Sequence, residues 1–198
     1  MVVGLDEVGR GSLAGPLAVG AVVLGDVREP PRGLTDSKAL SPRQREELAP
    51  HVREWARDWS LGWASAREID AWGLRVALSV AATRAVAGLT VAPSFALIDG
   101  PVNFLRLPRD IAMGTPVPAA KFADLAHETL IRGDARSAVI AGASVIAKVA
   151  RDDLMRELHV AHPSYGWDEN KGYGTRAHRD SLRAQGPTTH HRQTWKLV

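Results

Sequence analysis

The sequence contains no cysteine, which excludes disulfide frameworks, thiolate zinc sites, iron–sulfur clusters and cysteine nucleophiles together. Any metal site must therefore use carboxylate or histidine ligands. No apolar run approaches the roughly 18 residues that a membrane-spanning helix needs. Asp6 and Glu7 also interrupt the first apolar run before it can form a signal peptide. These absences predict a cytoplasmic protein.

Neither sign of charge dominates. The 198 residues include 25 Lys and Arg against 22 Asp and Glu, a formal net charge of +3. This balance permits a polyanionic partner without requiring one. The apolar fraction of 45% suffices for a hydrophobic core without disulfide or metal staples. The length favours one domain with at most a small appendage.

Four apolar runs have the length and the Val- and Leu-rich composition of β-strands. They are residues 2–5, 16–24, 59–64 and 95–98. The first two are close enough in sequence to form a hairpin, so we expect an antiparallel pair at the start of the sheet. The alternation of later strands with helical segments indicates an α/β fold.

Helix start signals lie between and after these strands. Ser41 begins a helix that Pro50 should stop or kink, and Ser65 begins another that Gly73 should break. The longest helical pattern covers 137–162 and is apolar in its first half and charged in its second, so its start should be buried and its end exposed. Two further expected elements are a short helix over 175–185 and a proline-rich surface loop over 101–120.

The loop Gly9-Arg10-Gly11-Ser12-Leu13-Ala14-Gly15 has the glycine content of a dinucleotide-binding fingerprint, but its third glycine falls one position late. A β-like run also follows it where the fingerprint needs a helix. Asp6 and Glu7 suit a divalent cation, and the glycines and Arg10 beside them suit a phosphate. The alternative is a solvated turn in which the acids cap a neighbour and Arg10 is a surface charge.

Two further acids stand at predicted element ends, Asp99 after the fourth strand and Asp134 before the long helix. Side chains at neighbouring strand ends of an α/β sheet converge. Carboxylates suit Mg²⁺ or Mn²⁺, and two such ions about 4 Å apart would align an attacking water and a leaving oxygen on a phosphodiester. Each acid taken singly also fits a turn residue or a helix cap.

Several longer motifs stand in order along nearly the whole chain. They are Asp6-Glu7-Val8-Gly9-Arg10-Gly11, Asp36-Ser37-Lys38, Leu97-Ile98-Asp99-Gly100, Gly133-Asp134, the segments 143–152, 162–166 and 170–175, and Thr189-His190-His191-Arg192. Together they resemble bacterial ribonuclease HII, a type 2 ribonuclease H. The resemblance implies a ribonuclease H-like mixed β-sheet flanked by helices over 1–161. A small C-terminal helical region for substrate binding follows at 162–198.

The resemblance implies an endonuclease that cuts the RNA strand of RNA/DNA hybrids and single ribonucleotides embedded in duplex DNA. The cut falls on the 5′ side of the ribonucleotide and leaves a 3′-hydroxyl and a 5′-phosphate. Catalysis and the binding of two Mg²⁺ or Mn²⁺ ions are assigned by similarity to Asp6, Glu7, Asp99 and Asp134. Duplex partners, a monomeric state and a role in ribonucleotide excision repair follow from the same resemblance.

Substrate contacts are also implied. Gly9, Arg10 and Gly11 would contact the 2′-hydroxyl and adjoining phosphates, since backbone groups brought close by glycine suit the detection of one hydroxyl. Tyr173 would pack on the deoxyribose beyond the ribonucleotide and recognise the RNA-to-DNA junction, with a core tyrosine in a turn as the alternative. The expected phosphate contacts are Lys38, Lys148, Lys171 and Arg192. A solvated surface role is the alternative for each lysine, and Lys148 alternatively supports a carboxylate from the helix face.

Two other classes of protein are alternatives to this assignment, and one segment departs from the usual spacing of the family. Ribonuclease HIII shares the acid set but normally carries an extra N-terminal domain, whereas this chain begins at the first strand. A noncatalytic hybrid-binding module gains nothing from clustered negative charge beside a phosphate. Asp99 and Asp134 stand 35 residues apart, so 101–130 is an elaboration on the compact spacing of many members. His190 and His191 predict a phosphate contact or a packing role in preference to a metal site.

Overall fold

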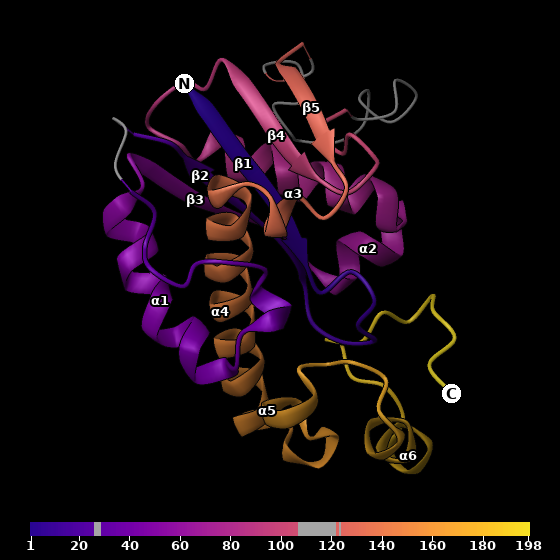
Figure 1. The fold of residues 1–198 in the computed structure, drawn as a ribbon. Coiled ribbons are helices and arrows are strands. Elements are labelled where there is room, and N and C mark those ends of the chain that lie inside the picture. Colours follow the sequence, from indigo (N-terminus) through magenta and orange to yellow (C-terminus); the bar gives the residue numbers. More distant parts are fainter. Residues whose placement is uncertain (26–28, 107–121, 123) are drawn as a thin grey trace.

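The computed structural model describes residues 1–25, 29–106, 122 and 124–198, and its strands form one mixed sheet in the order β3-β2-β1-β4-β5 (Figure 1). The strands are β1 (Val2–Val8), β2 (Leu17–Val23), β3 (Asp58–Ala64), β4 (Phe95–Asp99) and β5 (Ala126–Leu130). β1 pairs antiparallel with β2, which pairs antiparallel with β3, whereas β4 lies parallel to both β1 and β5. The predicted α/β fold with a leading antiparallel pair is confirmed.

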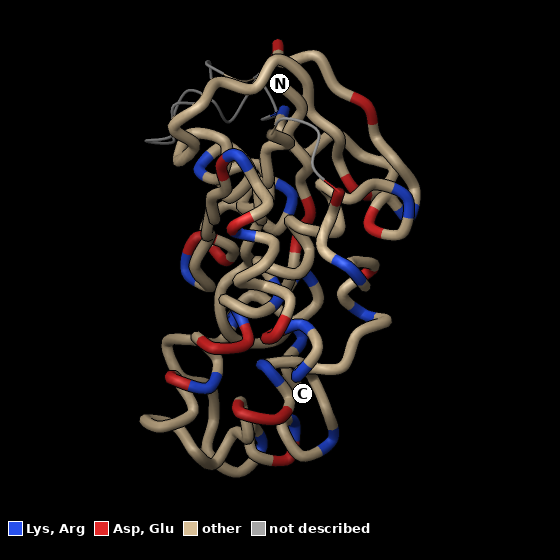
Figure 2. The backbone as a smooth tube through the Cα atoms, turned by 60° about the vertical axis from the view of Figure 1, so that its left-hand side comes forward, with Lys and Arg blue, Asp and Glu red and all other residues tan. Residues whose placement is uncertain are grey.

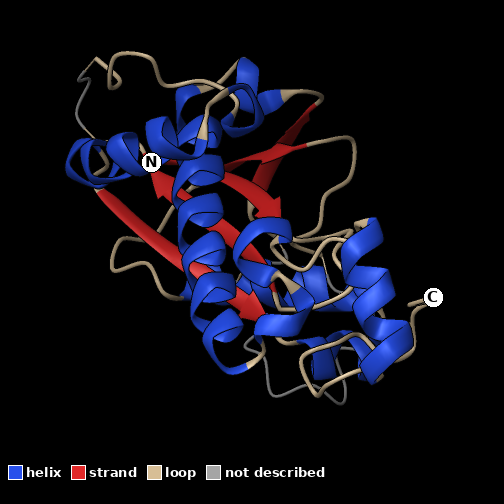
Figure 3. Ribbon diagram, turned by 90° about the horizontal axis from the view of Figure 1, so that it is seen from below, coloured by secondary structure: helices blue, strands red, loops and turns tan. Residues whose placement is uncertain are grey.

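Helices surround the strands (Figure 3). The α-helices are α1 (Pro42–Trp55), α2 (Ala66–Trp72), α3 (Leu74–Ala87), α4 (Ala138–Ala161), α5 (Trp167–Asn170) and α6 (Arg176–Gln185), and the short 3₁₀ turns are η1 (Ser37–Ala39), η3 (Gly133–Ala135) and η4 (Pro163–Tyr165). α4 packs on β1 and β2, and α3 packs on β2 and β3. Since successive side chains of a strand point to opposite faces, β2 contributes to the apolar core on both sides of the sheet.

Pro50 was predicted to stop or kink this helix; α1 continues through Pro50 to Trp55, so the stop is wrong and the kink stays a prediction. Pro50 cannot donate the backbone hydrogen bond of a helical residue. Val52 and Trp55, which follow it, are nevertheless buried in a cluster that includes Ile146 of α4. This burial keeps the last turn helical. The predicted break at Gly73, which has a φ of 78°, is confirmed.

Two glycines let α4 approach the sheet closely. A Cβ atom at Gly4 would lie 2.4 Å from the carbonyl carbon of Val139, and one at Gly20 would lie 2.3 Å from the carbonyl oxygen of Ala143. Asp6 pairs with Gly20 across β1 and β2, and it faces the same side of the sheet as Gly4. The glycines therefore bring the backbone of α4 against the face from which Asp6 projects.

The charged sequence of the second half of α4 predicted that this half is exposed. The prediction is wrong for part of it. Arg151 is 0% exposed and Asp152 is also buried, because the C-terminal segment packs across this part of the helix. α5 and α6 lie beyond the lower end of α4 in Figure 1. One apolar cluster contains residues from both sides of the predicted boundary at 161/162. The buried members of this cluster are Leu13, Ala14, Met155, Tyr165, Trp167 and Leu182. The division into 1–161 and 162–198 stays a prediction.

β5 was missed from the sequence because it is an edge strand whose residues, AHETL, are mostly polar and exposed. It lies inside the predicted elaboration over 101–130, of which 107–121 and 123 fall outside the described residues. Most of the expected surface loop over 101–120 falls there too. Basic and acidic positions are interspersed over the sheet and the C-terminal segment, in keeping with the small net charge (Figure 2). Within the described part of the chain, no helix has both the length and the apolar character that crossing a bilayer requires.

Candidate active site

Three carboxylates meet at one edge of the sheet. Asp6 projects from the end of β1, Asp99 is the last residue of β4, and Asp134 lies in η3. One ligand oxygen from each lies within 4.8 Å of the others. β1 and β4 are parallel, so their carboxyl ends meet at the same edge and bring Asp6 and Asp99 together.

Asp99 also fixes the backbone that carries Asp134. Its Oδ1 accepts hydrogen bonds from the backbone N–H of Gly133 at 2.7 Å and from that of Asp134 at 3.4 Å. Arg132, immediately before this turn, adopts the left-handed conformation with a φ of 57°. The large sequence separation between the two acids is therefore closed by direct hydrogen bonds.

The buried acids repel one another. Burial above all, together with the charges of Glu7 and Asp99, raises the pKa of Asp6 to about 8, against a hydrogen bond from Ser144. Burial, followed by the charge of Asp99, raises the pKa of Asp134. The amine of Lys38 lies 3.8 Å from Oδ2 of Asp134 and opposes these effects only in part. The three side chains offer only oxygen ligands, and a bound cation would offset the repulsion among their charges. Both properties fit a hard divalent ion such as Mg²⁺ or Mn²⁺.

Glu7 lies on the opposite face of β1 from Asp6 and outside the group of three. Its carboxylate pairs with Arg10 at 3.5 Å. Burial raises the pKa of Glu7, Arg10 lowers it and Asp99 raises it. Glu7 and Asp99 together line a pocket of about 590 Å³ whose apolar wall includes Phe104. Asp99 thus belongs to the cluster of three carboxylates and also lines the pocket beside Glu7.

The glycine loop (residues 9–15) lies beside these acids, and Arg192 holds it from beneath. Arg192 donates to the carbonyl oxygens of Arg10 at 2.8 Å and Gly9 at 2.5 Å, and to the hydroxyl of Ser12 at 3.0 Å. It is 0% exposed, and burial lowers its pKa to about 9. The phosphate contact expected of Arg192 does not fit this position. By contrast, Arg10 is exposed and the space at Gly11 is open.

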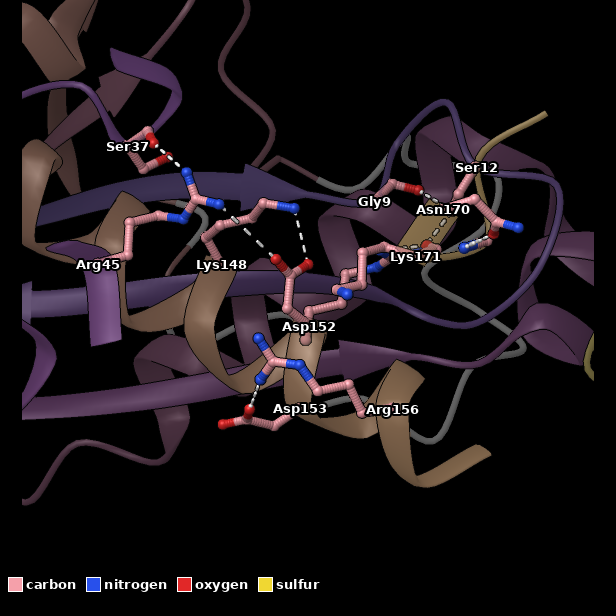
Figure 4. A network of polar contacts seen from close by, with 12 residues as sticks. Gly9, Ser12, Ser37, Arg45, Lys148, Asp152, Asp153, Arg156, Asn170 and Lys171 are labelled. Carbon is pink, nitrogen blue, oxygen red and sulfur yellow. Dashed lines mark hydrogen bonds and ion pairs between the residues drawn. The ribbon is translucent and has the colours of Figure 1, made fainter. Parts of the chain in front are cut away.

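The three predicted lysines occupy different settings. The side chain of Lys38 is exposed beside Asp134. Lys148 donates to Oδ1 of Asp152 at 2.7 Å, so the carboxylate that it supports from the helix face is one on α4 itself (Figure 4). Lys171 donates to the carbonyl oxygen of Asp168. Of the three lysines, Lys38 is the one that borders the acidic cluster.

The tyrosine turn (residues 170–174) places Tyr173 at the surface. Its side chain is 37% exposed, so the alternative of a core tyrosine is wrong. The Lys148 amine lies 6.0 Å and the Arg151 guanidinium 5.6 Å from the ring centroid. His178 donates from Nδ1 to the carbonyl oxygen of Tyr173 at 2.9 Å and so holds the turn.

His190 and His191 lie in an aromatic cluster with Trp167 and His178. The backbone N–H of Thr188 donates to Nδ1 of His191 at 2.9 Å, and Nε2 of His191 lies 3.1 Å from Nε2 of His178. Burial lowers the pKa of His191 to about 4, so the ring is neutral near pH 7. The packing role is confirmed.

Four polar residues that support the site were not predicted as part of it: Ser12, Arg45, Ser144 and Arg151. Ser144 bonds with Asp6 and with Ser37, whose hydroxyl lies 2.7 Å away. Arg45 donates to the carbonyl oxygens of Ser37 and Leu40, which flank Lys38 (Figure 4). The sequence offered one signal for two of these residues, because Ser144 and Arg151 lie within the motif 143–152. Nothing in that motif indicates which of its charged side chains are buried.

A sheet of this order with acids at the ends of β1 and β4 defines the class of ribonuclease H-like nucleases. The sequence model described as Ribonuclease HII matches residues 3–198. The chain therefore belongs to the ribonuclease HII family and is a type 2 ribonuclease H, an endonuclease. Enzymes of this family act on RNA/DNA substrates.

Individual relatives agree with this assignment. Ribonuclease HII of Synechococcus sp. (strain WH7803) is 46% identical over 198 residues, which cover 98% of this chain and 94% of that protein. RNase HII of Archaeoglobus fulgidus, solved in a complex with PCNA, has a TM-score of 0.76 at 26% identity, over 100% of this chain and 95% of that one. Bst-RNase HIII, solved in complex with Mn²⁺, shares the fold at a TM-score of 0.64 and 18% identity, over 99% of this chain and 67% of that one.

Stability without metal should decrease as the pH rises from about 7.5 to about 8.5. Asp6 is expected to ionise near pH 4 in the unfolded state and near pH 8 in the folded state, so raising the pH favours unfolding. The buried histidines, with pKa values below 6.5, are largely neutral in both states over this range. Thermal unfolding in EDTA measures the slope, and Asp6→Asn should flatten it. An equal slope in the variant would assign the effect to other groups.

Proposed function

We propose that this protein hydrolyses the phosphodiester on the 5′ side of a ribonucleotide, both in RNA/DNA hybrids and at single ribonucleotides embedded in duplex DNA. The products are a 3′-hydroxyl and a 5′-phosphate. The observation that carries the proposal is the gathering of Asp6, Asp99 and Asp134 within 4.8 Å beside an open glycine loop. A cytoplasmic location remains an expectation from the sequence, and a monomeric state and a role in ribonucleotide excision repair remain expectations from the resemblance.

Asp6, Glu7, Asp99 and Asp134 are the residues we assign to two divalent ions. Mg²⁺ or Mn²⁺ in such a site supplies an activated water and stabilises negative charge on the phosphate. Asp99 borders both Glu7 and the other two acids, so we assign it to both ions. The binding of Mn²⁺ by Bst-RNase HIII, which shares this fold, supports a divalent ion here.

The glycine loop is the element we assign to recognition of the ribose. Nothing lies within 4 Å of a Cβ atom built at Gly11, so a sugar can approach the backbone there. Arg10 is exposed beside it, and Lys38 is exposed on the other side of the acids; both are placed to bind phosphates. Lys148 and Lys171 already bond to protein oxygens, so we assign them secondary contacts with the duplex backbone.

A duplex with one ribonucleotide tests the proposal. The labelled strand should be cut once, on the 5′ side of the ribonucleotide, with Mg²⁺ or Mn²⁺ and not with EDTA. A duplex of DNA alone should stay intact, and a uniform RNA/DNA hybrid should be cut at many positions. Cutting of the hybrid without cutting at the single ribonucleotide would restrict the function to hybrids. No cutting of either duplex would overturn it.

Tyr173→Ala should lower the preference for the RNA-to-DNA junction by about tenfold, because stacking and packing on an aromatic ring are worth about 1–3 kcal/mol. The exposed ring offers a flat apolar surface to a sugar without a 2′-hydroxyl. The measurement is kcat/KM on the junction duplex divided by kcat/KM on the uniform hybrid. Tyr173→Phe keeps the ring and should keep the ratio. An equal loss of activity on both substrates would contradict this role.

A further inference from the structure

Arg151 is buried between the glycine loop and the tyrosine turn. It is 0% exposed, and within the described parts of the chain no carboxylate lies close enough to form an ion pair with it. Burying an arginine without a counter-charge is costly unless its donors are satisfied. The hydrogen bonds from its guanidinium go to these two elements and to Pro16, which follows the glycine loop and precedes β2. Arg151 therefore holds the two elements in place relative to each other.

On one side Arg151 holds the glycine loop. Its guanidinium donates to the hydroxyl of Ser12 at 2.7 Å and to the carbonyl oxygens of Ala14 at 3.2 Å and Pro16 at 2.8 Å. Arg192 donates to the same hydroxyl at 3.0 Å, and that hydroxyl donates to the carbonyl oxygen of Gly9 (Figure 4 labels Gly9 and Ser12). Two buried guanidinium groups therefore converge on one oxygen beneath the loop.

On the other side Arg151 holds the tyrosine turn. Its Nη1 donates to the carbonyl oxygen of Lys171 at 2.9 Å, and its guanidinium lies 5.6 Å from the centroid of the Tyr173 ring. Lys171 has a positive φ of 51°, a conformation that non-glycine residues rarely adopt. The bond from Arg151 offsets part of the cost of this conformation. The backbone N–H of Leu13 donates to the carbonyl oxygen of Gly172 at 2.8 Å and joins the two elements a second time.

We propose that Arg151 is a positioning residue that fixes the distance between the glycine loop and Tyr173, and that this distance sets the selectivity for the RNA-to-DNA junction. The inference rests on the proposed function, in which the loop contacts the ribose and Tyr173 the next deoxyribose. The planar guanidinium directs donors to both elements at once in a rigid fork. A lysine keeps the charge but has one flexible ammonium group, which cannot hold both elements in the same geometry.

A double-mutant cycle tests the proposal on the whole protein. Arg151→Lys should lower the junction preference, measured as kcat/KM on the single-ribonucleotide duplex over that on a uniform RNA/DNA hybrid, by about tenfold, within the usual coupling range for residues in contact. Tyr173→Ala in that background should add little, because Tyr173 is already misplaced. If Arg151→Lys leaves the ratio unchanged, or if the two losses multiply independently, the proposal is overturned.

Two controls separate positioning from general damage. Arg156→Lys makes the same substitution on the same helix at a partly exposed residue paired with Glu46, and it should keep the ratio. Mn²⁺ affinity, measured by calorimetry, should be unchanged in Arg151→Lys because Arg151 bonds to none of the four acids. A purely structural role would lower the unfolding temperature and leave the ratio unaltered, which would also overturn the proposal.

Should Arg151→Lys fail to fold, Ser12→Ala provides the second variant. It removes the hydroxyl that both guanidinium groups share and should lower the ratio in the same direction; an unchanged ratio would contradict the proposal. If the wild-type protein does not cut at single ribonucleotides at all, the proposed function fails and this inference fails with it. If the wild type prefers the junction and both variants keep that preference, only the role of Arg151 fails.

Discussion

Asp6→Asn should reduce cleavage by at least about 1000-fold, the scale of loss seen when a catalytic group is removed, while the protein remains folded. Asparagine keeps the shape of the side chain but removes one of three carboxylates that lie within 4.8 Å of one another. The pKa of about 8 for Asp6 means that its charged form is disfavoured by burial, so the neutral amide should fold at least as stably in EDTA. Single-turnover cleavage and thermal unfolding measure the two effects.

Asp153→Asn is the matched control. Asp153 is an exposed acid on α4 that pairs with Arg156, and its loss should change cleavage by less than about twofold, as expected of a surface substitution. If Asp6→Asn retained a tenth or more of the wild-type rate at saturating Mg²⁺, Asp6 would not be an essential ligand.

Gly9→Ala should destabilise the protein by about 2–4 kcal/mol, since it combines backbone strain with overpacking. Gly9 has a φ of 82°, which disfavours any side chain. A Cβ atom there would also lie 2.1 Å from Nε of Arg151. Activity should decrease with stability, because the glycine loop can no longer close over the guanidinium. Urea unfolding measures the free energy.

Gly11→Ala, two residues further on, separates folding from recognition. The space at Gly11 is open, so the free energy of unfolding should change by less than about 1 kcal/mol. Substrate affinity should still fall, because the added methyl group occupies the surface that we assign to the ribose. Equal destabilisation by the two alanines would contradict the contact between Gly9 and Arg151, and unchanged affinity in Gly11→Ala would contradict ribose binding there.

The elements that could be predicted are those whose signals are local. Helices begin at Ser41 and Ser65 as predicted, each with a capping box, and Asp99 ends β4 where the apolar run predicted a strand end. Asp6 and Asp99 could be brought together in advance because parallel strands end at the same edge. The approach of Asp134 also followed from the family resemblance, although its turn is held by bonds from Asp99 that no sequence pattern specifies.

The elements that could not be predicted depend on long-range packing. An arginine expected at a phosphate and one that holds a loop from beneath have the same sequence signal, and Arg192 proved to be the second kind. Arg151 and Asp152 are buried because the C-terminal segment covers α4, which the polarity of the helix alone does not indicate. By contrast, the position of Glu7 on the opposite face of β1 from Asp6 could have been predicted, because successive side chains of a strand alternate between its two faces.

Phosphorothioate substitution tests most directly whether the acids bind a metal ion that also contacts the scissile phosphate. In each of two diastereomers, one nonbridging oxygen of that phosphate is replaced by sulfur. Mg²⁺ prefers hard oxygen ligands, whereas Mn²⁺ accepts sulfur more readily. In one of the two diastereomers of a single-ribonucleotide duplex, we expect cleavage with Mg²⁺ to slow by at least about tenfold and Mn²⁺ to restore it. Sulfur substitution that slowed cleavage equally with both ions, in both diastereomers, would contradict a metal-bound phosphate at Asp6, Glu7, Asp99 and Asp134.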